Sequence, residues 1–344
     1  MKKRRYYLLA FFISICLSGI FLACDTDPEA LNIERPYTYS EEYYESLRAY
    51  KESDHQVFYG WYAAPGQLEG VTAGYRQSPS MGEHIAGVPD SLDFLSLWFG
   101  IPSLREDDSL SSYNPIAYEE MRFAQEVKGT KMLVVEITRM EGYSWLELSE
   151  EGIRDYGDYL MGMVFDNDLD GLDLDYEPEG DWIAGENFAT LVEYIGNRLG
   201  PMSENPDKYL IIDYYNQTPP PSVEPYINYL VNQAYTQGRT STSAQYLQSR
   251  YNQVSDWLPT EKFIVTENLG EWYETGGAPF TEADGNTMNE DGEQIYSLEG
   301  MARWNPRQGE KGGFGGFYFG RDYINYPPYQ NVRQSIQAAN PAVR

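Results

Sequence analysis

The stretch that decides the fold is residues 169–177, LDGLDLDYE, in which apolar and acidic side chains alternate. Alternation with a period of two is typical of a β-strand, whose successive side chains point to opposite faces. Leu172, Leu174 and Tyr176 therefore share one face, and Asp173, Asp175 and Glu177 share the other. Pro178 follows directly and ends the strand.

Strand and helix patterns alternate along the rest of the chain. We expect strands at residues 57–62, 92–99, 131–138, 171–177, 209–215, within 226–235, 262–267 and 313–319. We expect helices at residues 40–52, 116–127, 146–163, 187–199, 243–251, 296–304 and 329–338. Strand–helix alternation indicates a parallel sheet, and eight such units indicate closure into a barrel.

The predicted fold class is α/β, a (β/α)8 TIM barrel, which a chain of 344 residues is long enough to form. Residues 66–90 are rich in Gly, Ser and Pro and show no helical pattern. The barrel is therefore expected to have a reduced first helix.

In a barrel, the acidic face of residues 169–177 would point into the lumen. Like charges a few ångströms apart in a poorly solvated site cannot all stay ionised, so at least one carboxyl should hold a proton at neutral pH. A protonated carboxyl at the mouth of a pocket suits a general acid. Active sites of such barrels lie at the C-terminal ends of the strands. Glu177, the last acidic residue before Pro178, is therefore the expected proton donor.

Two other interpretations of this segment remain. The first is a solvated acidic edge, against which the alternating leucines argue. The second is calcium, because residues 166–177 match the EF-hand loop pattern. However, the eighth loop position, usually apolar, is Asp173, and the exiting helix would begin at Pro178 with a glycine in its first turn. His55 and His84 lack metal-site neighbours in the sequence, and there is no phosphate loop, so neither a metal nor a cofactor is expected.

The N-terminus has the pattern of a bacterial secretory signal. Basic residues 2–5 precede an apolar stretch at 7–23, and acidic residues follow at once. Residues 21–24, FLAC, resemble a lipobox, in which Cys24 would carry lipid after cleavage. Ordinary cleavage and retention of the segment as an anchor are the alternatives. The expected organisation is a lipoprotein signal peptide at 1–23, a tether and N-terminal helix at 24–49, and a catalytic barrel at 50–344.

Composition narrows the partners. A hydrophobic content of 42% excludes a disordered chain. The formal net charge of −28 argues against nucleic acid and against anionic membrane surfaces, so the membrane is expected to be contacted only through the lipid anchor. Only two cysteines are present, and Cys16 lies in the segment to be removed, so no disulfide is expected. An uncharged ligand such as a glycan is compatible with this charge.

The pattern Asp-Gly-x-Asp-x-Asp-x-Glu, formed by Asp170, Gly171, Asp173, Asp175 and Glu177, resembles the signature of glycoside hydrolase family 18. This family contains chitinases and endo-β-N-acetylglucosaminidases. The resemblance covers the barrel, roughly residues 50 to 340.

A second motif, Gln233-Ala234-Tyr235, resembles the Gln-x-Tyr pair of the endo-β-N-acetylglucosaminidase branch, where chitinases have Met-x-Tyr-Asp. The acidic stretch at 25–30 after Cys24 resembles the surface-export signal of Bacteroidetes lipoproteins from glycan-foraging systems. The resemblance implies a lipid-anchored, surface-exposed protein of the bacterial outer membrane that works beside a glycan-uptake system.

The family resemblance implies substrate-assisted retaining catalysis, an exception to the two-carboxylate scheme. The sugar's 2-acetamido oxygen attacks its own anomeric carbon and forms an oxazolinium ion. Glu177 would protonate the departing oxygen and then activate water, while Asp175 would orient the acetamido N–H. Asp173 would share a proton with Asp175. Tyr235 would donate a hydrogen bond to the acetamido oxygen, and Gln233 would position the same group.

Further substrate contacts are expected near strand ends, although each aromatic residue there is equally suited to packing. Besides Asp170 of the motif, the candidates are Tyr214, Tyr215, Asn216, Trp61, Trp98 and Trp272.

The leading hypothesis is a glycosidase that cleaves the β-1,4 bond between the GlcNAc residues of N-glycan cores, with a glycan or glycoprotein as substrate. The alternatives are a chitinase-like hydrolase and a surface glycan-binding lipoprotein with weak turnover. The intact Asp173, Asp175 and Glu177 set argues against a pure binding protein, because clustered carboxylates are costly to maintain.

Overall fold

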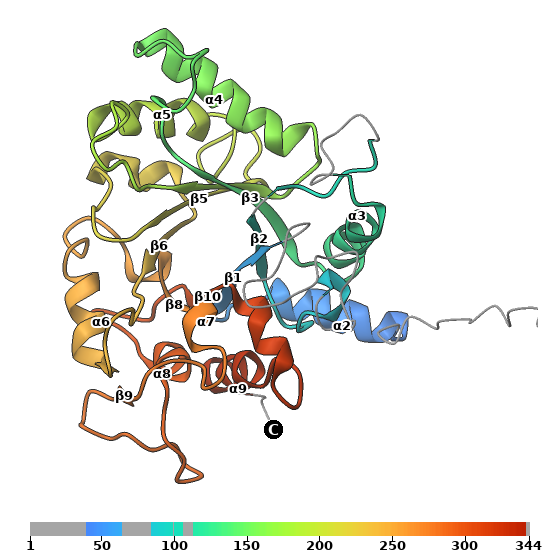
Figure 1. The fold of residues 1–344 in the computed structure, drawn as a ribbon, viewed down its shortest axis with the longest axis vertical. Coiled ribbons are helices and arrows are strands. Elements are labelled where there is room, and N and C mark those ends of the chain that lie inside the picture. Colours follow the sequence, from blue (N-terminus) through green and yellow to red (C-terminus); the bar gives the residue numbers. More distant parts are fainter. Residues whose placement is uncertain (1–38, 64–83, 99, 106–112, 342–344) are drawn as a thin grey trace, which may run out of the picture. The chain divides into compact units, whose positions relative to one another are not determined.

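Eight parallel strands close into a barrel in the order β1–β10–β8–β6–β5–β4–β3–β2, with helices around it (Figure 1). This computed structural model describes residues 39–63, 84–98, 100–105 and 113–341. The strands of the barrel are β1 (Val57–Ala63), β2 (Phe94–Trp98), β3 (Lys131–Ile137), β4 (Gly171–Asp175), β5 (Tyr209–Tyr214), β6 (Tyr229–Gln233), β8 (Phe263–Asn268) and β10 (Gly313–Phe317). Each coincides with a predicted strand, so the (β/α)8 fold is confirmed.

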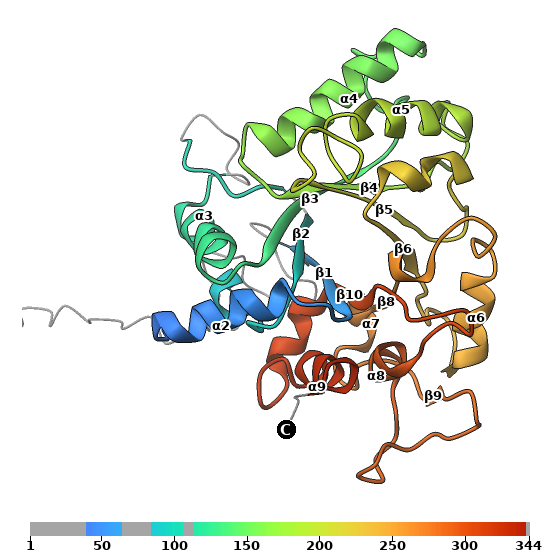
Figure 2. The same ribbon diagram turned by 180° about the vertical axis from the view of Figure 1, so that it is seen from behind.

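The predicted helices are all present, and Figure 2 shows them from the opposite side. They are α2 (Glu41–Lys51), α3 (Pro115–Arg122) with its π-helical continuation η4 (Phe123–Val127), α4 (Glu150–Phe165), α5 (Glu186–Gly196), α6 (Ala244–Tyr251), α8 (Ser297–Arg303) and α9 (Gln330–Ala339). Helix α4 begins four residues later than predicted because Ser149 caps it, accepting a hydrogen bond from the Gly152 amide at 3.2 Å.

Several short elements were not predicted. They are α7 (Leu269–Trp272), a two-stranded parallel sheet of β7 (Thr242–Ser243) and β9 (Phe280–Thr281), and the 3₁₀ turns η3 (Ile85–Gly87), η5 (Pro221–Tyr226), η6 (Thr260–Lys262) and η7 (Phe319–Ile324). Most of the segment expected to replace the first barrel helix, residues 64–83, lies outside the described residues. In the described part between β1 and β2, η3 is the one helical turn.

The core has two layers on the two faces of the barrel. The outer layer, between strands and helices, contains Leu172, Leu174 and Tyr176 of β4 and its extension. The lumenal layer consists of Val57, Tyr59, Trp61, Phe94, Leu133, Val135, Ile211, Val231 and Ile264. Complete burial of each leucine stabilises the fold by about 1.5–3 kcal/mol. The acidic face of β4 therefore points into the lumen, as its period of two predicted.

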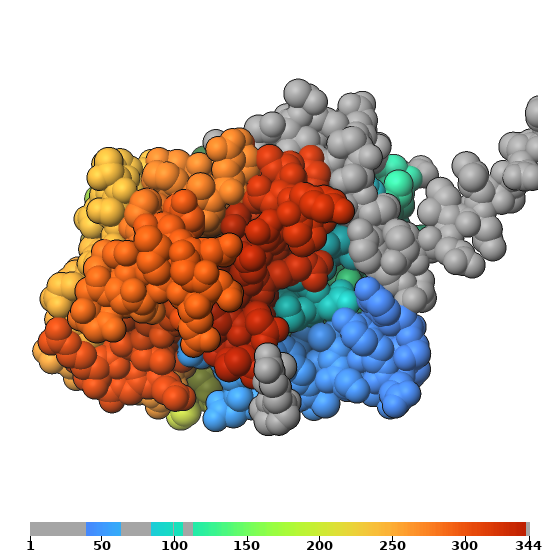
Figure 3. All heavy atoms as spheres, turned by 90° about the horizontal axis from the view of Figure 1, so that it is seen from below, coloured from blue at the N-terminus to red at the C-terminus, as the bar shows by residue number. Residues whose placement is uncertain are grey.

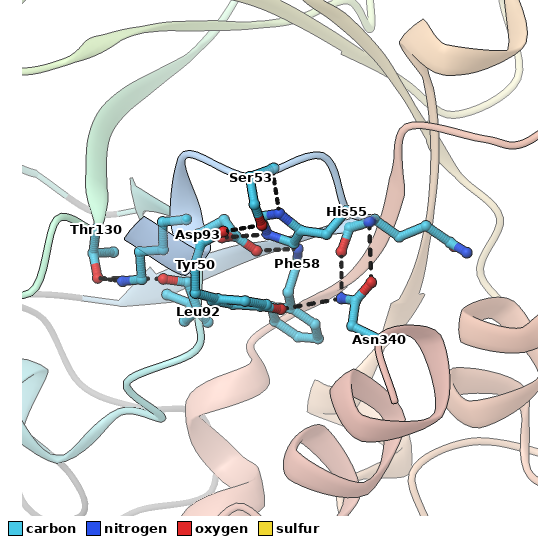
Figure 4. Close-up of polar contacts among 10 residues, drawn as sticks. Tyr50, Ser53, His55, Phe58, Leu92, Asp93, Thr130 and Asn340 are labelled. Atoms are coloured by element: carbon cyan, nitrogen blue, oxygen red, sulfur yellow. Dashed lines mark hydrogen bonds and ion pairs between the residues drawn. The ribbon is translucent and has the colours of Figure 1, made fainter. Parts of the chain in front are cut away.

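A hydrogen-bond network closes the N-terminal end of the barrel (Figure 4). Asp93, just before β2, accepts the Phe58 amide of β1 at 2.8 Å and pairs with His55 Nε2 at 3.0 Å. Burial lowers the pKa of His55, but the hydrogen bond and charge of Asp93 outweigh burial and raise it overall. At the end of α9, Asn340 exchanges two hydrogen bonds with the backbone of Gln56. In Figure 3 the blue surface of the N-terminal part borders the red surface of the C-terminal part.

Helix α2 is fastened to the barrel by its basic residues. Arg48 donates to the Val127 carbonyl at 2.7 Å, and Lys51 donates to the Thr130 hydroxyl at 2.7 Å. The predicted signal peptide and the lipidation site Cys24 lie in residues 1–38, outside the described residues. In the part of the chain that is described, no helix combines the length and apolarity that crossing a bilayer requires.

Replacing Asp93 with alanine leaves the buried Phe58 amide without its acceptor and His55 without its partner. We expect the free energy of unfolding to fall by about 2–4 kcal/mol in urea denaturation followed by tryptophan fluorescence. Asp54→Ala, which removes an exposed carboxylate from the loop between α2 and β1, is the control and should change stability by less than about 0.5 kcal/mol. Equal losses in both variants would contradict the role assigned to Asp93.

Candidate active site

Strand β4 places three carboxyl groups in a row that rises from the lumen to the rim. Asp173 is fully buried, Asp175 is 3% exposed, and Glu177 is half-buried just beyond the end of the strand. Backbone hydrogen bonds continue past β4, because the Tyr176 amide donates to the Asp213 carbonyl at 2.8 Å. The predicted common face of the three carboxylates is therefore confirmed.

Asp173, the deepest of the row, receives three donors at one oxygen. Its Oδ2 accepts the Tyr59 hydroxyl at 2.6 Å, the Trp61 indole N–H at 2.9 Å and the Ser96 hydroxyl at 3.1 Å. Burial raises the pKa of Asp173 to about 6, and these hydrogen bonds offset part of the rise. Trp61, predicted to stack on sugar, thus uses its indole N–H to hold Asp173.

Asp213 is a buried acid that was not predicted from the sequence. It lies on β5 opposite Asp175 in the strand register and accepts Gln233 Nε2 at 2.5 Å. Burial, followed by the charges of Asp175 and Asp173, raises its pKa well above the ordinary value. Its carboxyl group interacts closely with those of Asp173 and Asp175, and three such buried groups cannot all stay ionised, so at least one proton is shared among them.

The upper two carboxyls of β4 are also shifted toward the protonated form. Burial, the charge of Glu177 and the charge of Asp173 together raise the pKa of Asp175 to about 8. Burial and the charge of Glu179 raise the pKa of Glu177, while the Arg139 guanidinium opposes the rise. Glu177 thus combines access to the rim with an increased tendency to hold a proton, which suits a general acid.

These groups open into a cavity of about 350 Å³ at the C-terminal end of the barrel. Seven of the predicted site residues line it: Trp61, Trp98, Asp175, Glu177, Tyr215, Gln233 and Tyr235. The Tyr235 ring lies parallel to that of Phe317, with centroids 6.0 Å apart. The structure adds Ile137, Asp213, Gln237, Asn268 and Phe317 to the lining. Ile137, Asn268 and Phe317 end their strands, so the strand-end argument used for the tryptophans applies to them equally.

Tyr214 and Asn216, predicted to reach the substrate, do not line the cavity. Tyr214 is fully buried in the outer core layer, because the period of two turns it away from its lumenal neighbour Asp213. Asn216 is exposed beyond the strand end. Of the three consecutive residues proposed there, Tyr215 alone reaches the cavity.

Asp170 and Trp272 also lie outside the lining of the cavity. Asp170 lies at the N-terminal end of β4, about 16 Å from Asp175 along the strand, and accepts the Met132 amide and Gln125 Nε2, each at 2.8 Å. It fastens neighbouring elements at the opposite end of the barrel. Trp272 lies in α7, outside the cavity lining.

The calcium interpretation conflicts with the structure. Residues Gly171–Asp175 form a barrel strand, so residues 166–177 do not fold into a compact binding loop. Across residues 39–63, 84–98, 100–105 and 113–341, no group of three or more His, Cys, Asp or Glu side chains is arranged to hold a metal ion.

Two charged residues fix the backbone around the cavity. Glu267, buried at the end of β8, accepts the amides of Thr236 at 2.9 Å and Asn268 at 2.8 Å, which holds the chain next to Tyr235. Arg139 donates to the Glu177 carbonyl at 3.0 Å and pairs with Glu179 at 2.8 Å. Arg139, which follows β3, therefore links its loop to the segment after β4 that carries Glu177.

A parallel eight-stranded barrel with a row of carboxyls rising to a cavity at its C-terminal rim defines a glycosidase of the TIM-barrel type. The family model for the TIM-barrel domain of endo-beta-N-acetylglucosaminidase EndoS matches residues 73–315, and the chain belongs to this family. It is thus a glycoside hydrolase of the endo-β-N-acetylglucosaminidase type, as the motif resemblance predicted.

The chain is also similar to individual proteins, and the solved structures among them share its fold. Endo-beta-N-acetylglucosaminidase F2 of Elizabethkingia meningoseptica is 26% identical, over 96% of this chain and 98% of the relative. The solved structure of BT1044 has a TM-score of 0.69 and 22% identity, over 88% of this chain and 93% of that one. The endo-beta-N-acetylglucosaminidase of Cordyceps militaris in apo form has a TM-score of 0.62 and 20% identity, over 88% and 97% of the two chains.

The shared protons make stability depend on pH. Raised pKa values mean that the folded protein holds protons that the unfolded chain has lost. Their contribution to stability is therefore complete below about pH 4, and it is lost as the pH rises toward the folded pKa of Asp175, about 8. Asp213→Asn removes one ionising group, so its melting temperature should fall by about 2–4 °C less than that of the unmodified protein between pH 5 and pH 9.

Calorimetry at both pH values checks this expectation. Asp207→Asn is the matched control, because it makes the same change at an exposed position just before β5. Parallel declines in all three proteins would show that Asp213 is not held protonated.

Proposed function

We propose that this protein hydrolyses the β-1,4 bond between the GlcNAc residues of N-glycan cores by substrate-assisted retaining catalysis. The observation that carries the proposal is that Asp175, Gln233 and Tyr235 line one cavity directly beside Glu177. One group is then available for acid–base chemistry, and three polar groups are available to hold the sugar's acetamido arm.

Glu177 acts first as acid and then as base. As the bond from C1 to the leaving oxygen breaks, the Glu177 proton passes to that oxygen. The acetamido carbonyl oxygen simultaneously bonds to C1 and forms the oxazolinium ion. Water then attacks C1 and gives a proton to Glu177, which restores the acid, while the bond from C1 to the acetamido oxygen breaks and the acetamido group re-forms. The raised pKa of Glu177 favours the protonated form that the first step needs.

Asp175 accepts the acetamido N–H and stabilises the positive charge that develops on it. With a pKa of about 8, Asp175 is mostly protonated in the resting site. A developing cation favours ionised Asp175, and Asp173, with a pKa of about 6, is the carboxyl of the cluster that can accept a proton at neutral pH. Tyr235 donates its hydroxyl to the acetamido oxygen, and Gln233 positions the same arm while holding Asp213.

The substrate assignment draws support from relatives. The fungal enzyme of Cordyceps militaris has been solved in complex with fucosyl-N-acetylglucosamine-Asn. That compound is a sugar linked to asparagine, and the Elizabethkingia relative is named an endo-beta-N-acetylglucosaminidase. A glycan or glycoprotein is accordingly the proposed substrate of this chain.

Incubation with high-mannose and complex N-glycoproteins, and separately with chitin oligomers, tests the proposal by mass spectrometry. We expect released glycans and a protein that keeps one GlcNAc per site. Glu177→Gln should lower kcat by about 10²–10⁴-fold, the usual contribution of general acid–base catalysis. Glu186→Gln, at the exposed start of α5, is the control and should leave turnover unchanged.

Each contrary result has a distinct meaning. Cleavage of chitin oligomers alone would replace the proposal with a chitinase-like activity. Binding of glycans with no product from any substrate would identify a glycan-binding protein. Full turnover by Glu177→Gln would disprove the assigned acid whatever the substrate.

We also propose that lipid on Cys24 anchors the protein at the surface of the outer membrane, beside a glycan-uptake system. The signal-like residues 1–24 support this location. Cys24→Ala should abolish incorporation of labelled palmitate and move the protein to the soluble fraction, whereas Cys16→Ala should not. Labelling that survives Cys24→Ala would contradict the anchor, and protection of the intact protein from protease on whole cells would contradict surface exposure.

A further inference from the structure

An exposed aromatic cluster is formed by the loop that joins β3 to α4 together with α4 itself. We call Tyr143, Trp145 and Tyr159 the aromatic platform. Their ring centroids lie 5.6–5.7 Å apart, and Tyr143 also packs against the buried Tyr156 at 5.5 Å. Trp145 is 52% exposed and Tyr159 is 41% exposed, so their rings remain open to solvent. A contiguous exposed apolar patch of this kind is typical of a binding site.

The platform is held in place without a ligand. The Tyr143 hydroxyl donates to the Glu136 carboxylate on β3. Fully buried Met140 anchors the start of the loop, and Asp181 accepts its amide at 3.1 Å and the Glu141 amide at 3.0 Å. When the rings are already fixed, little side-chain entropy is lost as a ligand stacks on them, which favours binding.

The same loop begins at the edge of the catalytic cavity. Ile137, the last residue of β3, lines the cavity, and Arg139 donates to the Glu177 carbonyl at 3.0 Å. Figures 1 and 2 show the loop running from β3 out to α4. The loop that carries Tyr143 and Trp145 therefore starts beside the proposed acid.

Charge and size narrow what the platform would bind. Exposed Glu141, Glu147 and Glu150 border it, which disfavours anionic ligands and anionic membranes. The apolar face of an aromatic ring can stack on the C–H face of a sugar, while the polar groups of Tyr and Trp stay hydrated. The cavity of about 350 Å³ is at the small end for a ligand pocket. A branched N-glycan is larger, so part of it must cross the rim.

We propose that Trp145 and Tyr159 form a second glycan contact, outside the catalytic cavity, that stacks on an uncharged sugar in the arms of the substrate. This inference rests on the proposed function and adds a determinant of specificity to it. An extended neutral glycan would reach Trp145 and Tyr159, whereas a glycan trimmed to its core would be too short to contact them.

The kinetic test compares one glycopeptide that carries a full high-mannose glycan with another trimmed to its core. The measured quantity is the ratio of kcat/KM for the full glycan to that for the core. Trp145→Ala should lower this ratio about two- to tenfold through KM, the size expected for loss of one aromatic contact. Trp145→Phe should restore most of it. Phe165→Ala, 44% exposed at the far end of α4, is the control and should leave the ratio unchanged.

An unchanged ratio in Trp145→Ala would overturn the proposal, and so would an equal loss on both glycopeptides, which would indicate a structural role for the loop.

A binding test separates this inference from the proposed function. In a Glu177→Gln background, titration with the free full glycan should give a Kd that Trp145→Ala weakens by about the factor seen in the kinetic ratio. If the unmodified protein cleaves neither glycopeptide, the proposed function fails, yet the titration still reports on the platform. An identical Kd with and without Trp145 would disprove the platform. Displacement by the deglycosylated protein product, with no displacement by free glycan, would assign the surface to polypeptide and would also disprove it.

Discussion

Three buried carboxyl groups in one lumen must share protons, and the upper half of the barrel is built around that requirement. Asp173, Asp175 and Asp213 come from adjacent strands whose register places the last two side by side. An apolar lumen would make their joint ionisation very costly. The neighbouring strands therefore supply hydrogen-bond donors to these carboxyls. A phenol and an indole from β1 donate to Asp173, and a side-chain amide from β6 donates to Asp213.

Because of this constraint, the groups proposed for catalysis lie at one end of the barrel and the stabilising network described above lies at the other. The N-terminal end is closed by Asp93, Asn340 and their partners, whose hydrogen bonds join the beginning and the end of the barrel. The C-terminal end keeps raised pKa values and an open cavity, a state that a protein retains only where the surrounding structure enforces it. Glu267 and Arg139 provide that enforcement on opposite sides of the opening.

The sequence predicted the parts of the site that lie on a strand whose polar and apolar residues alternate, because such alternation shows which side chains share a face. On β4, acids alternate with leucines, so the lumenal face was evident. On β5, residues 209–215 read YLIIDYY, and both faces of a parallel strand are apolar, so the pattern does not say which residues point inward. For that reason Asp213 was missed and Tyr214 was given the wrong face. Asp170 shows a different limit of motif-based prediction. It belongs to the motif, but it forms structural hydrogen bonds at the end of β4 opposite the cavity. The fold itself was predictable because strand–helix alternation is a local property that recurs along most of the chain.

The bond between Arg139 and the Glu177 carbonyl also bears on how such an enzyme can diversify. The loop from β3 to α4 is fixed at its base by this bond and by the two amides that Asp181 receives, whereas residues 144–148 are mostly exposed. Mutations in that outer part can alter the aromatic surface while the anchored base keeps the proposed acid in place. The proposed glycan contact and the proposed acid can thereby evolve separately, although both depend on a single loop.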